Sequence, residues 1–279
     1  MSYEKTEDII RDAYKNRYGV ASFNIFNYEK IKFAADAAEQ AGKPVIVQLY
    51  PGFTDYISFE TTVGIVKSAA DKVKTPVGLH LDHCYNIDEL KCAMRAGFTS
   101  VMYDGSKLPF DENIKNTREA AAAAKAYGAV VEAELGNIGN AANVAEYTDE
   151  KNFTDPNDAK KFLEETKIFS LAVAVGNAHG NYSVLPNLDI SRIQKISGSL
   201  KIPLVLHGGS GIPDTQLQEA VSGGIAKINV ATEYFCTFYK QVKKYTEINT
   251  REDIFACMRA AKKETAGFLT DKINLLNFK

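Results

Sequence analysis

Eight short, apolar, β-rich runs alternate with longer helical patterns along this chain of 279 residues. Most of the runs are continuously apolar, which is typical of parallel strands buried on both faces. Eight strand–helix units in a chain of this length favour an α/β fold closed into a (β/α)8 barrel over an open sheet. The predicted strands cover 19–25, 44–50, 76–82, 99–104, 129–135, 170–176, 203–208 and 226–231.

No stretch rich in Pro, Gly or Ser divides the chain, so the sequence predicts a single TIM-barrel domain over residues 1–279. We expect an additional helix before the first strand and one or two additional helices over 251–273. The longest irregular stretch, 136–157, follows the fifth strand, and a loop of this length inside a compact domain is usually functional. The clearest helical patterns between strands cover 28–41, 58–73 and 112–128.

The composition argues against several classes of protein. With 24 % charged residues and a net charge of −2, the chain lacks the basic excess of a sequence-independent nucleic-acid binder. No apolar run reaches the length of a membrane span, and the charged N-terminus does not have the pattern of an export signal. The four scattered cysteines form no CxxC pair, which favours reduced thiols and a cytoplasmic protein.

Polar residues gather where the predicted strands end, which is where the active site of such a barrel forms. Three of the four histidines, His83, His179 and His207, fall at this rim although they are far apart in sequence. A lone histidine is more often a hydrogen-bonded structural residue, but three at one rim favour a catalytic zinc site with an open position. The other polar residues at the strand ends are Asn24, Asp82, Asp104, Glu134 and Asn229.

The stretch "GLHLDHCYN" raises a question of direction, because side chains alternate between the two faces of a strand. His80 lies three positions before His83, so we expect it to point into the helix layer or to lie in a lower layer of the barrel, without a metal role. Asp82 and His83 also point to opposite sides of a regular strand. If both serve the site, the strand must turn or bulge at its end.

Glycine-rich strand ends provide a second signal. "HGGSG" (207–211) ends the seventh strand and "INVATE" (228–233) ends the eighth, and phosphate sites in these barrels often form after those two strands. Backbone N–H groups of Gly208, Gly209 and Ser210 could approach an anion closely, and residues 229–232 open a helix whose N-terminus attracts negative charge. The alternative is a tight turn that needs glycine for its backbone alone.

Seven stretches between about residues 20 and 235 together resemble the class II, metal-dependent ketose-bisphosphate aldolases, the fructose- and tagatose-bisphosphate aldolase family. This resemblance implies that His83, His179 and His207 hold a catalytic Zn²⁺, although Co²⁺, Mn²⁺ or Fe²⁺ remain alternatives in the cell. It also implies that Asp82 exchanges the proton of the substrate's C4 hydroxyl. The stretches are "FNIFNYE", "HLDHC", "SVMYDGSKLPFDENI", "VEAELGNIG", "AVGNAHGNY", "LVLHGGSGIPD" and "KINVATE".

The same resemblance implies further sites. Asp104 and Glu134 match positions that can take a second or displaced metal ion. A monovalent cation is expected near the phosphate, and the family is usually a homo-oligomer, a dimer or tetramer. The residues expected to bind substrate, mainly the phosphate of a dihydroxyacetone phosphate half, are Asn24, Gly180, Gly208, Gly209, Ser210, Asn229, Val230, Ala231 and Thr232.

The loop after the fifth strand departs from the family pattern. Where the family has a second glycine followed by acidic residues, this chain has Asn140 and then Ala141, Ala142 and Asn143. Glu146 is the nearest acidic candidate for exchanging a proton at C3 of the triose phosphate. Either the loop is re-spaced and Glu146 does this, or proton exchange is carried differently, or the activity is altered.

Residues expected at the ends of the substrate pocket also differ from the family pattern. Val184 and Asn187 stand where tagatose-type relatives have lysines, and Tyr50 follows the second strand where a small residue is usual. Tyr50 could fill substrate space, offer a phenol or point into the helix layer. Arg251, with Arg259 next, is the positional candidate for holding a second phosphate, unless it is a solvated surface residue.

The leading interpretation is reversible cleavage of fructose 1,6-bisphosphate or tagatose 1,6-bisphosphate into dihydroxyacetone phosphate and glyceraldehyde 3-phosphate. A different phosphorylated ketose or keto-acid sugar, a barrel metal hydrolase and a non-catalytic phosphosugar-binding protein remain alternatives. Composition alone does not exclude a mechanism in which Lys107 or Lys227 forms a Schiff base with the substrate.

Overall fold

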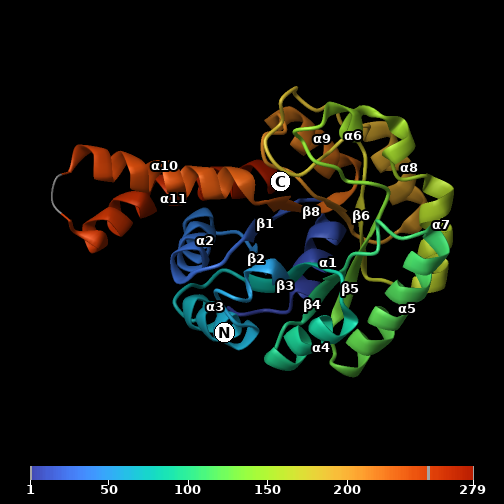
Figure 1. The fold of residues 1–279 in the computed structure, drawn as a ribbon, viewed down its shortest axis with the longest axis horizontal. Helices are drawn as coiled ribbons and strands as arrows, with labels where there is room; N and C mark the ends of the chain where they lie inside the picture. The colour runs from blue at the N-terminus through green and yellow to red at the C-terminus, as the bar shows by residue number, and fades with distance from the viewer. Residues whose placement is uncertain (1, 250–251, 279) are drawn as a thin grey trace.

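The predicted (β/α)8 barrel is confirmed. A computed structural model describes residues 2–249 and 252–278 and places eight parallel strands in one closed barrel (Figure 1). Each strand pairs with the next in sequence, and β8 pairs with β1 to close the barrel. The strands are β1 Val20–Asn24, β2 Val45–Leu49, β3 Val77–Cys84, β4 Ser100–Tyr103, β5 Val130–Leu135, β6 Ser170–Val173, β7 Leu204–Leu206 and β8 Ile225–Val230.

Helices surround the strands, and α10 and α11 form a hairpin that projects from the barrel (Figure 1). The expected C-terminal tail is one long helix, α11. None of the described helices is long and apolar enough to cross a membrane. The helices are α1 Thr6–Asn16, α2 Tyr28–Ala41, α3 Phe59–Ala70, α4 Ile87–Ala96, α5 Phe110–Ala126, α6 Val144–Thr148, α7 Pro156–Thr166, α8 Ile190–Leu200, α9 Asp214–Gly223, α10 Thr232–Ile248 and α11 Ile254–Leu276, with 3-10 turns at Pro51–Phe53 and Glu150–Asn152.

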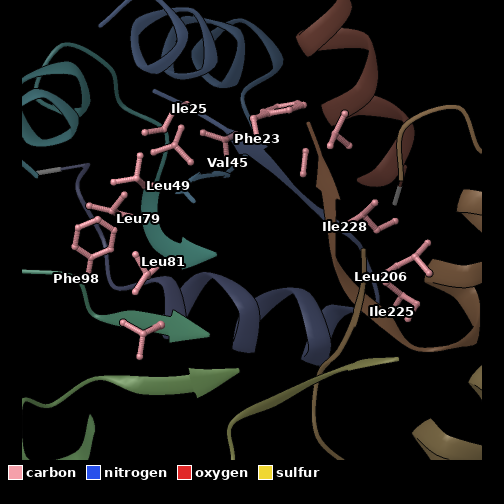
Figure 2. Packing of buried hydrophobic residues seen from close by; sticks show 14 of the residues in the cluster. Phe23, Ile25, Val45, Leu49, Leu79, Leu81, Phe98, Leu206, Ile225 and Ile228 are labelled. Atoms are coloured by element: carbon pink, nitrogen blue, oxygen red, sulfur yellow. The ribbon is translucent and has the colours of Figure 1, made fainter. Parts of the chain in front are cut away.

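The largest apolar cluster lies between the strands and the surrounding helices (Figure 2). Side chains such as Phe23, Leu79 and Leu81 are fully buried there. This packing explains the continuously apolar strand runs, because the outer face of each strand needs apolar contacts with the helix layer.

The inside of the barrel contains a buried ionic layer. Glu132 on β5 accepts hydrogen bonds from Lys227 Nζ on β8 at 2.9 and 3.0 Å, and its Oε1 lies 3.1 Å from His207 Nε2. His80 Nδ1 lies 2.8 Å from Ser100 Oγ, and His80 Nε2 is 3.8 Å from Glu132. His80 therefore occupies the lower layer of the barrel, one of its two expected places, below the rim.

Helix α10 is fixed to the barrel through Lys30 on α2. The Lys30 side chain is almost fully buried, and its Nζ lies 4.3 to 4.5 Å from the ring centroids of Tyr234, Phe235 and Phe238. Tyr234 also donates a 2.7 Å hydrogen bond to the Lys30 carbonyl. These contacts set the position of the first turn of α10, which starts at the rim of the barrel.

The ionic layer leads to a stability prediction. Replacing Lys227 with methionine leaves the Glu132 carboxylate buried without its ammonium partner, so the free energy of unfolding should fall by about 3–5 kcal/mol. The double variant Glu132→Gln/Lys227→Met removes both charges, so its free energy of unfolding should fall by less. Urea unfolding of the three proteins measures both effects. A Lys227→Met variant that is as stable as the parent would contradict this account of the layer.

Candidate active site

A cavity of about 290 Å³ opens at the carboxyl ends of the strands, where the sequence predicts the site. Its volume lies near the lower end of the range for small-molecule sites, which suits a short sugar better than a large cofactor. The residues that line it are Asn24, Tyr50, Phe53, Asp82, His83, Tyr85, Asp104, Ser106, Lys107, Glu134, Asn137, Ile138, His179, Gly180, Gly208, Ser210, Asn229, Ala231, Thr232 and Phe235.

Three histidines converge here: His83 and His179 line the cavity, and His207 is fully buried beside them. Ligand atoms of His83, His179 and His207 all lie within 4.8 Å of one another, and their ring centroids are 4.6 to 5.6 Å apart. His83 is the second-last residue of β3, His207 directly follows β7, and His179 lies in the segment after β6. Barrel closure thus brings together three imidazoles separated by many residues in sequence.

A bulge at the end of β3 places Asp82 and His83 in the same cavity, as the sequence predicts for a strand in which both serve the site. The register with β4 shifts between Leu81 and Cys84, and His83 has a φ of 44°. A residue other than glycine rarely adopts this left-handed conformation, so the surrounding structure must hold it there. The bulge also explains why His80 and His83 both face the barrel interior despite their spacing.

Carboxylates orient two of the imidazoles. His83 Nδ1 lies 2.8 Å from Asp104 Oδ2, and His207 Nε2 lies 3.1 Å from Glu132 Oε1. The second ring nitrogens face other carboxylates, His83 Nε2 toward Asp82 and His207 Nδ1 toward Glu134. A carboxylate bonded to the far nitrogen of an imidazole is the usual way in which a metal-binding histidine is oriented.

The donor set fits a divalent cation. Within the described residues, His207 Nδ1 and Glu134 Oε2 are buried and have no hydrogen-bond partner, although they lie only 3.1 Å apart. His83, Asp104 and Glu134 form a second group whose ligand atoms lie within 4.8 Å of one another. Three imidazoles suit zinc, and neighbouring carboxylates add negative charge that a cation would balance.

The electrostatics differ among the imidazoles, because burial and the charges of His83 and His207 lower the pKa of His179 to about 3. Burial by itself lowers the pKa of His207, but Glu132 and Glu134 outweigh burial and raise that pKa to about 10. Burial by itself raises the pKa of Asp104, but its hydrogen bonds with His83 and Ser106 hold the pKa well below its usual value. The cavity thus stabilises ionised carboxylates and cationic partners together.

Asp82 is held by two amides from other strands. Its Oδ2 accepts a 2.8 Å hydrogen bond from Asn24 on β1, and its Oδ1 accepts one of 3.2 Å from Asn229 on β8. Gln48 on β2 in turn donates to Asn24 at 2.8 Å, which fixes the amide's orientation. Burial raises the pKa of Asp82, but the charge of His83 and the Asn24 amide outweigh burial, so the carboxyl is ionised at neutral pH.

The glycine-rich strand ends form a concave surface beside the histidines. Gly208 has a φ of 61°, and a Cβ atom there would lie 1.9 Å from the Ala178 carbonyl oxygen. Ser210 Oγ accepts a 3.1 Å hydrogen bond from the Glu233 N–H in the first turn of α10. Thr232, the first residue of that helix, lines the cavity.

The structure does not bring every expected phosphate-binding residue to this surface. The Gly209 N–H donates a 2.9 Å hydrogen bond to the Asn229 carbonyl, so it is not free to bind an anion. Val230 is fully buried. Neither residue lines the cavity, whereas Gly180, Ala231 and the other expected residues at the strand ends do.

The 136–157 loop supports His179. The His179 N–H donates to the Gly139 carbonyl at 2.9 Å, and the Ala141 N–H donates to the His179 carbonyl at 2.8 Å. The Glu146 carboxylate accepts from the Asn140 N–H at 2.6 Å and from the Asn143 amide at 2.9 Å. Glu146 is therefore occupied within the loop and does not line the cavity.

The two arginine candidates are not part of the described cavity. Arg251 lies outside the described residues, and Arg259 is an exposed residue of α11 that does not line the cavity. Lys227 is fully buried in its ion pair with Glu132, which makes it a poor Schiff-base nucleophile.

The sequence-based candidates omit several cavity residues, including Tyr85, Ser106 and Asn137. All three follow predicted strand ends within a few positions, so a wider search at each strand end would have included them. Glu132 carried no such signal, because it lies inside the fifth strand, two residues before Glu134. Tyr50 lines the cavity, which excludes the expectation that it points into the helix layer.

Known proteins are similar to this chain in sequence and fold. Residues 4–279 match the family model described as fructose-bisphosphate aldolase class-II. The sulfofructosephosphate aldolase of Alkalicoccus urumqiensis is 36 % identical over 275 residues, which are 98 % of this chain and 94 % of that protein.

Solved structures agree with this comparison. The YdjI aldolase from Escherichia coli K12 is 35 % identical, with a TM-score of 0.87 over 99 % of this chain and 97 % of that one. The fructose-bisphosphate aldolase of Campylobacter jejuni, at 23 % identity, shares the fold alone, with a TM-score of 0.86 over 99 % of this chain and 95 % of that one.

The close approach at Gly208 yields a second prediction. Gly208→Ala should lower the free energy of unfolding by at least about 1–2 kcal/mol, because alanine is strained at positive φ and its Cβ would clash with Ala178. Binding of inorganic phosphate should weaken as well. The matched control is Gly198→Ala in α8, where a Cβ meets nothing within 4 Å. Thermal unfolding and calorimetric titration measure both effects, and equal behaviour of the two variants would contradict the strain argument.

Proposed function

Because the chain belongs to the class II fructose-bisphosphate aldolase family and is thus an aldehyde-lyase, we propose that it reversibly cleaves a phosphorylated ketose into dihydroxyacetone phosphate and an aldehyde. The observation that carries this proposal is the placement of Asp82 beside three convergent histidines. Its carboxylate lies 3.9 Å from His83 Nε2 and is held by amides on both sides.

We propose that His83, His179 and His207 hold a zinc ion, with Asp104 and Glu134 available to a second or displaced ion. When bound, zinc would act as a Lewis acid toward the ketose carbonyl and stabilise the negative charge that develops next to it. Neutral imidazoles would leave the charge of the ion undiminished. The proposed monovalent cation near the phosphate stays a prediction.

Asp82 performs the proton transfer in this proposal. Its ionised carboxylate removes the proton of the C4 hydroxyl, and the electrons of that O–H bond form the aldehyde C=O as the C3–C4 bond breaks. The electron pair of the broken bond passes to C3 and is delocalised toward the C2 oxygen. A proton delivered to C3 then completes dihydroxyacetone phosphate, and condensation reverses each step.

The phosphate of the dihydroxyacetone half would occupy the concave surface formed by Gly180, Gly208, Ser210 and Thr232. Backbone at the two positive-φ glycines approaches a ligand without a Cβ in the way, and the N-terminus of α10 adds positive potential. Anchoring this end fixes the C3–C4 bond relative to Asp82, which is the orientation that cleavage requires.

The relatives widen the range of substrates to be tested. The names of similar proteins include a sulfofructosephosphate aldolase and a fructose-bisphosphate aldolase. Fructose 1,6-bisphosphate, tagatose 1,6-bisphosphate and sulfofructosephosphate are therefore the three candidate substrates. All three would present the same phosphorylated end to the surface at β6–β8.

We also propose that the chain forms a homo-oligomer. The projecting α10–α11 hairpin carries large apolar side chains that are 65 to 76 % exposed, an unusual number for one surface element of an isolated chain. A second copy of this chain would cover them. These residues are Tyr239, Ile248, Ile254 and Phe255.

The proposed activity is tested by release of triose phosphate. Zinc-loaded protein should release dihydroxyacetone phosphate from at least one of the three candidate substrates, and a chelator should abolish release until zinc is restored. A coupled dehydrogenase assay measures the product. If the zinc-loaded protein cleaves none of the three, the proposed substrates are wrong.

The role of Asp82 is tested by Asp82→Asn, which keeps the shape of the side chain but removes its charge. The kcat for cleavage should fall about 10²–10⁴-fold, while the zinc content per chain stays unchanged. The contrasting variant His179→Ala should lose zinc. An Asp82→Asn protein that keeps its kcat would exclude Asp82 as the proton carrier.

The role of Glu146 stays a prediction that needs the loop to open, because its carboxylate is bonded to Asn140 and Asn143. If Glu146 delivers the C3 proton, Glu146→Gln should slow exchange of the C3 hydrogen of dihydroxyacetone phosphate with D₂O about 10²-fold. NMR measures this exchange independently of cleavage. An unchanged rate would leave Glu146 a structural residue of the loop.

A further inference from the structure

The cavity has two opposite ends because the barrel is circular. Residues of the proposed phosphate surface follow β6, β7 and β8. At the other end of the cavity, Tyr50 follows β2, Tyr85 follows β3, and Lys107 follows β4. In the closed strand order, β2–β4 lie across the barrel from β6–β8. A ketose anchored at β6–β8 would therefore pass over the histidines and place its aldehyde half at the β2–β4 end.

The β2–β4 end of the cavity contains side chains of both signs of charge. Asp104, directly after β4, and Glu134, on the neighbouring β5, line the cavity and would repel a second anionic group on the substrate. Among the described residues, Lys107 is the sole lysine or arginine that lines the cavity. Within residues 2–249 and 252–278, its ammonium is therefore the side-chain cation available there to an anion on the aldehyde half.

Local structure holds Lys107 at the cavity mouth. Asp104 Oδ1 accepts hydrogen bonds from the Ser106 N–H at 3.1 Å and from Ser106 Oγ at 2.7 Å, which fixes the turn after β4. The Lys107 Nζ lies 6.0 Å from the ring centroid of Tyr85. The lysine is exposed, so its ammonium can reach a ligand without first losing an ion-pair partner within the described residues.

Two phenols complete this end of the cavity. Tyr50 packs edge-on against Phe53, with ring centroids 5.6 Å apart, and Tyr85 directly follows β3. Both rings line the cavity, and their hydroxyls can donate hydrogen bonds to an oxyanion. Aromatic walls around a cation form a subsite for a small charged terminus better than for an extended polymer.

We propose that Lys107, flanked by Tyr50 and Tyr85, binds a terminal tetrahedral oxyanion on the aldehyde half of the substrate. This inference rests on the proposed aldolase activity and names the substrate class of the same site. A lysine ammonium is a point charge without the fixed fork of an arginine, so the subsite accepts either a phosphate or a sulfonate.

Condensation with dihydroxyacetone phosphate tests the proposal with three aldehydes of equal carbon number. Glyceraldehyde 3-phosphate carries a phosphate, 3-sulfolactaldehyde carries a sulfonate, and glyceraldehyde is neutral. The zinc-loaded parent should use at least one anionic aldehyde with a kcat/KM about tenfold or more above that for glyceraldehyde. The ratio between the two anionic aldehydes then distinguishes phosphate from sulfonate.

Variants assign this preference to one side chain. Lys107→Met should lose about tenfold in kcat/KM for the anionic aldehydes, mainly through KM, and should leave the value for glyceraldehyde unchanged. Lys107→Arg keeps the charge and should restore most of the preference. The matched control is Lys115→Met, which removes an exposed lysine of α5 that lies outside the cavity lining.

The possible failures are distinguishable. Equal losses for anionic and neutral aldehydes in Lys107→Met would overturn the subsite, because the residue would then act on the reaction and not on the terminal charge. A parent protein that prefers glyceraldehyde would overturn it as well. A zinc-loaded parent that condenses none of the three aldehydes, yet binds dihydroxyacetone phosphate, would instead contradict the proposed function.

Discussion

Closure of the barrel between β1 and β8 is the constraint on which the site depends. The proposed metal ligands come from β3, β6 and β7, and the amides that hold Asp82 come from β1 and β8. In an open sheet the first and last strands would lie at opposite edges, and Asn24 and Asn229 could not both reach one carboxylate. The hydrogen bonds of β1 to β8 therefore determine the position of the proposed proton carrier, Asp82, as well as the fold.

Inside the barrel, a second layer of polar residues lies below the rim and also joins residues of different strands. His80, Glu132 and Lys227 lie two residues before Asp82, Glu134 and Asn229 on the same strands, so each of these three rim residues has another polar residue below it. Glu132 links the layers, because it binds Lys227 and also contacts His207. The orientation of one proposed metal ligand is thus coupled to a buried ion pair that substrate cannot reach.

The sequence predicted the barrel and the converging histidines, and it required a turn or bulge at the end of the third strand if Asp82 and His83 both serve the site, because each of these follows from the alternation of side chains along a strand or from the order of the strands. It did not predict the ionic layer, since Glu132 and Lys227 lie inside runs that look buried on both faces. Whether such a residue faces the helices or the barrel interior depends on strand register. It also could not place Glu146, because a loop's side-chain partners, here Asn140 and Asn143, depend on tertiary contacts and not on spacing.

The circular order of the strands has a consequence for how such an enzyme can diverge. The residues assigned to phosphate binding lie after β6–β8, whereas Tyr50 and Lys107 lie on separate short turns after β2 and β4. If Tyr50 and Lys107 bind the aldehyde half as proposed, substitutions in those turns would change the accepted aldehyde without moving a histidine or Asp82. New substrates can then arise through a few point mutations that preserve the underlying carbon–carbon bond chemistry, so overall similarity is a better guide to the reaction than to the sugar.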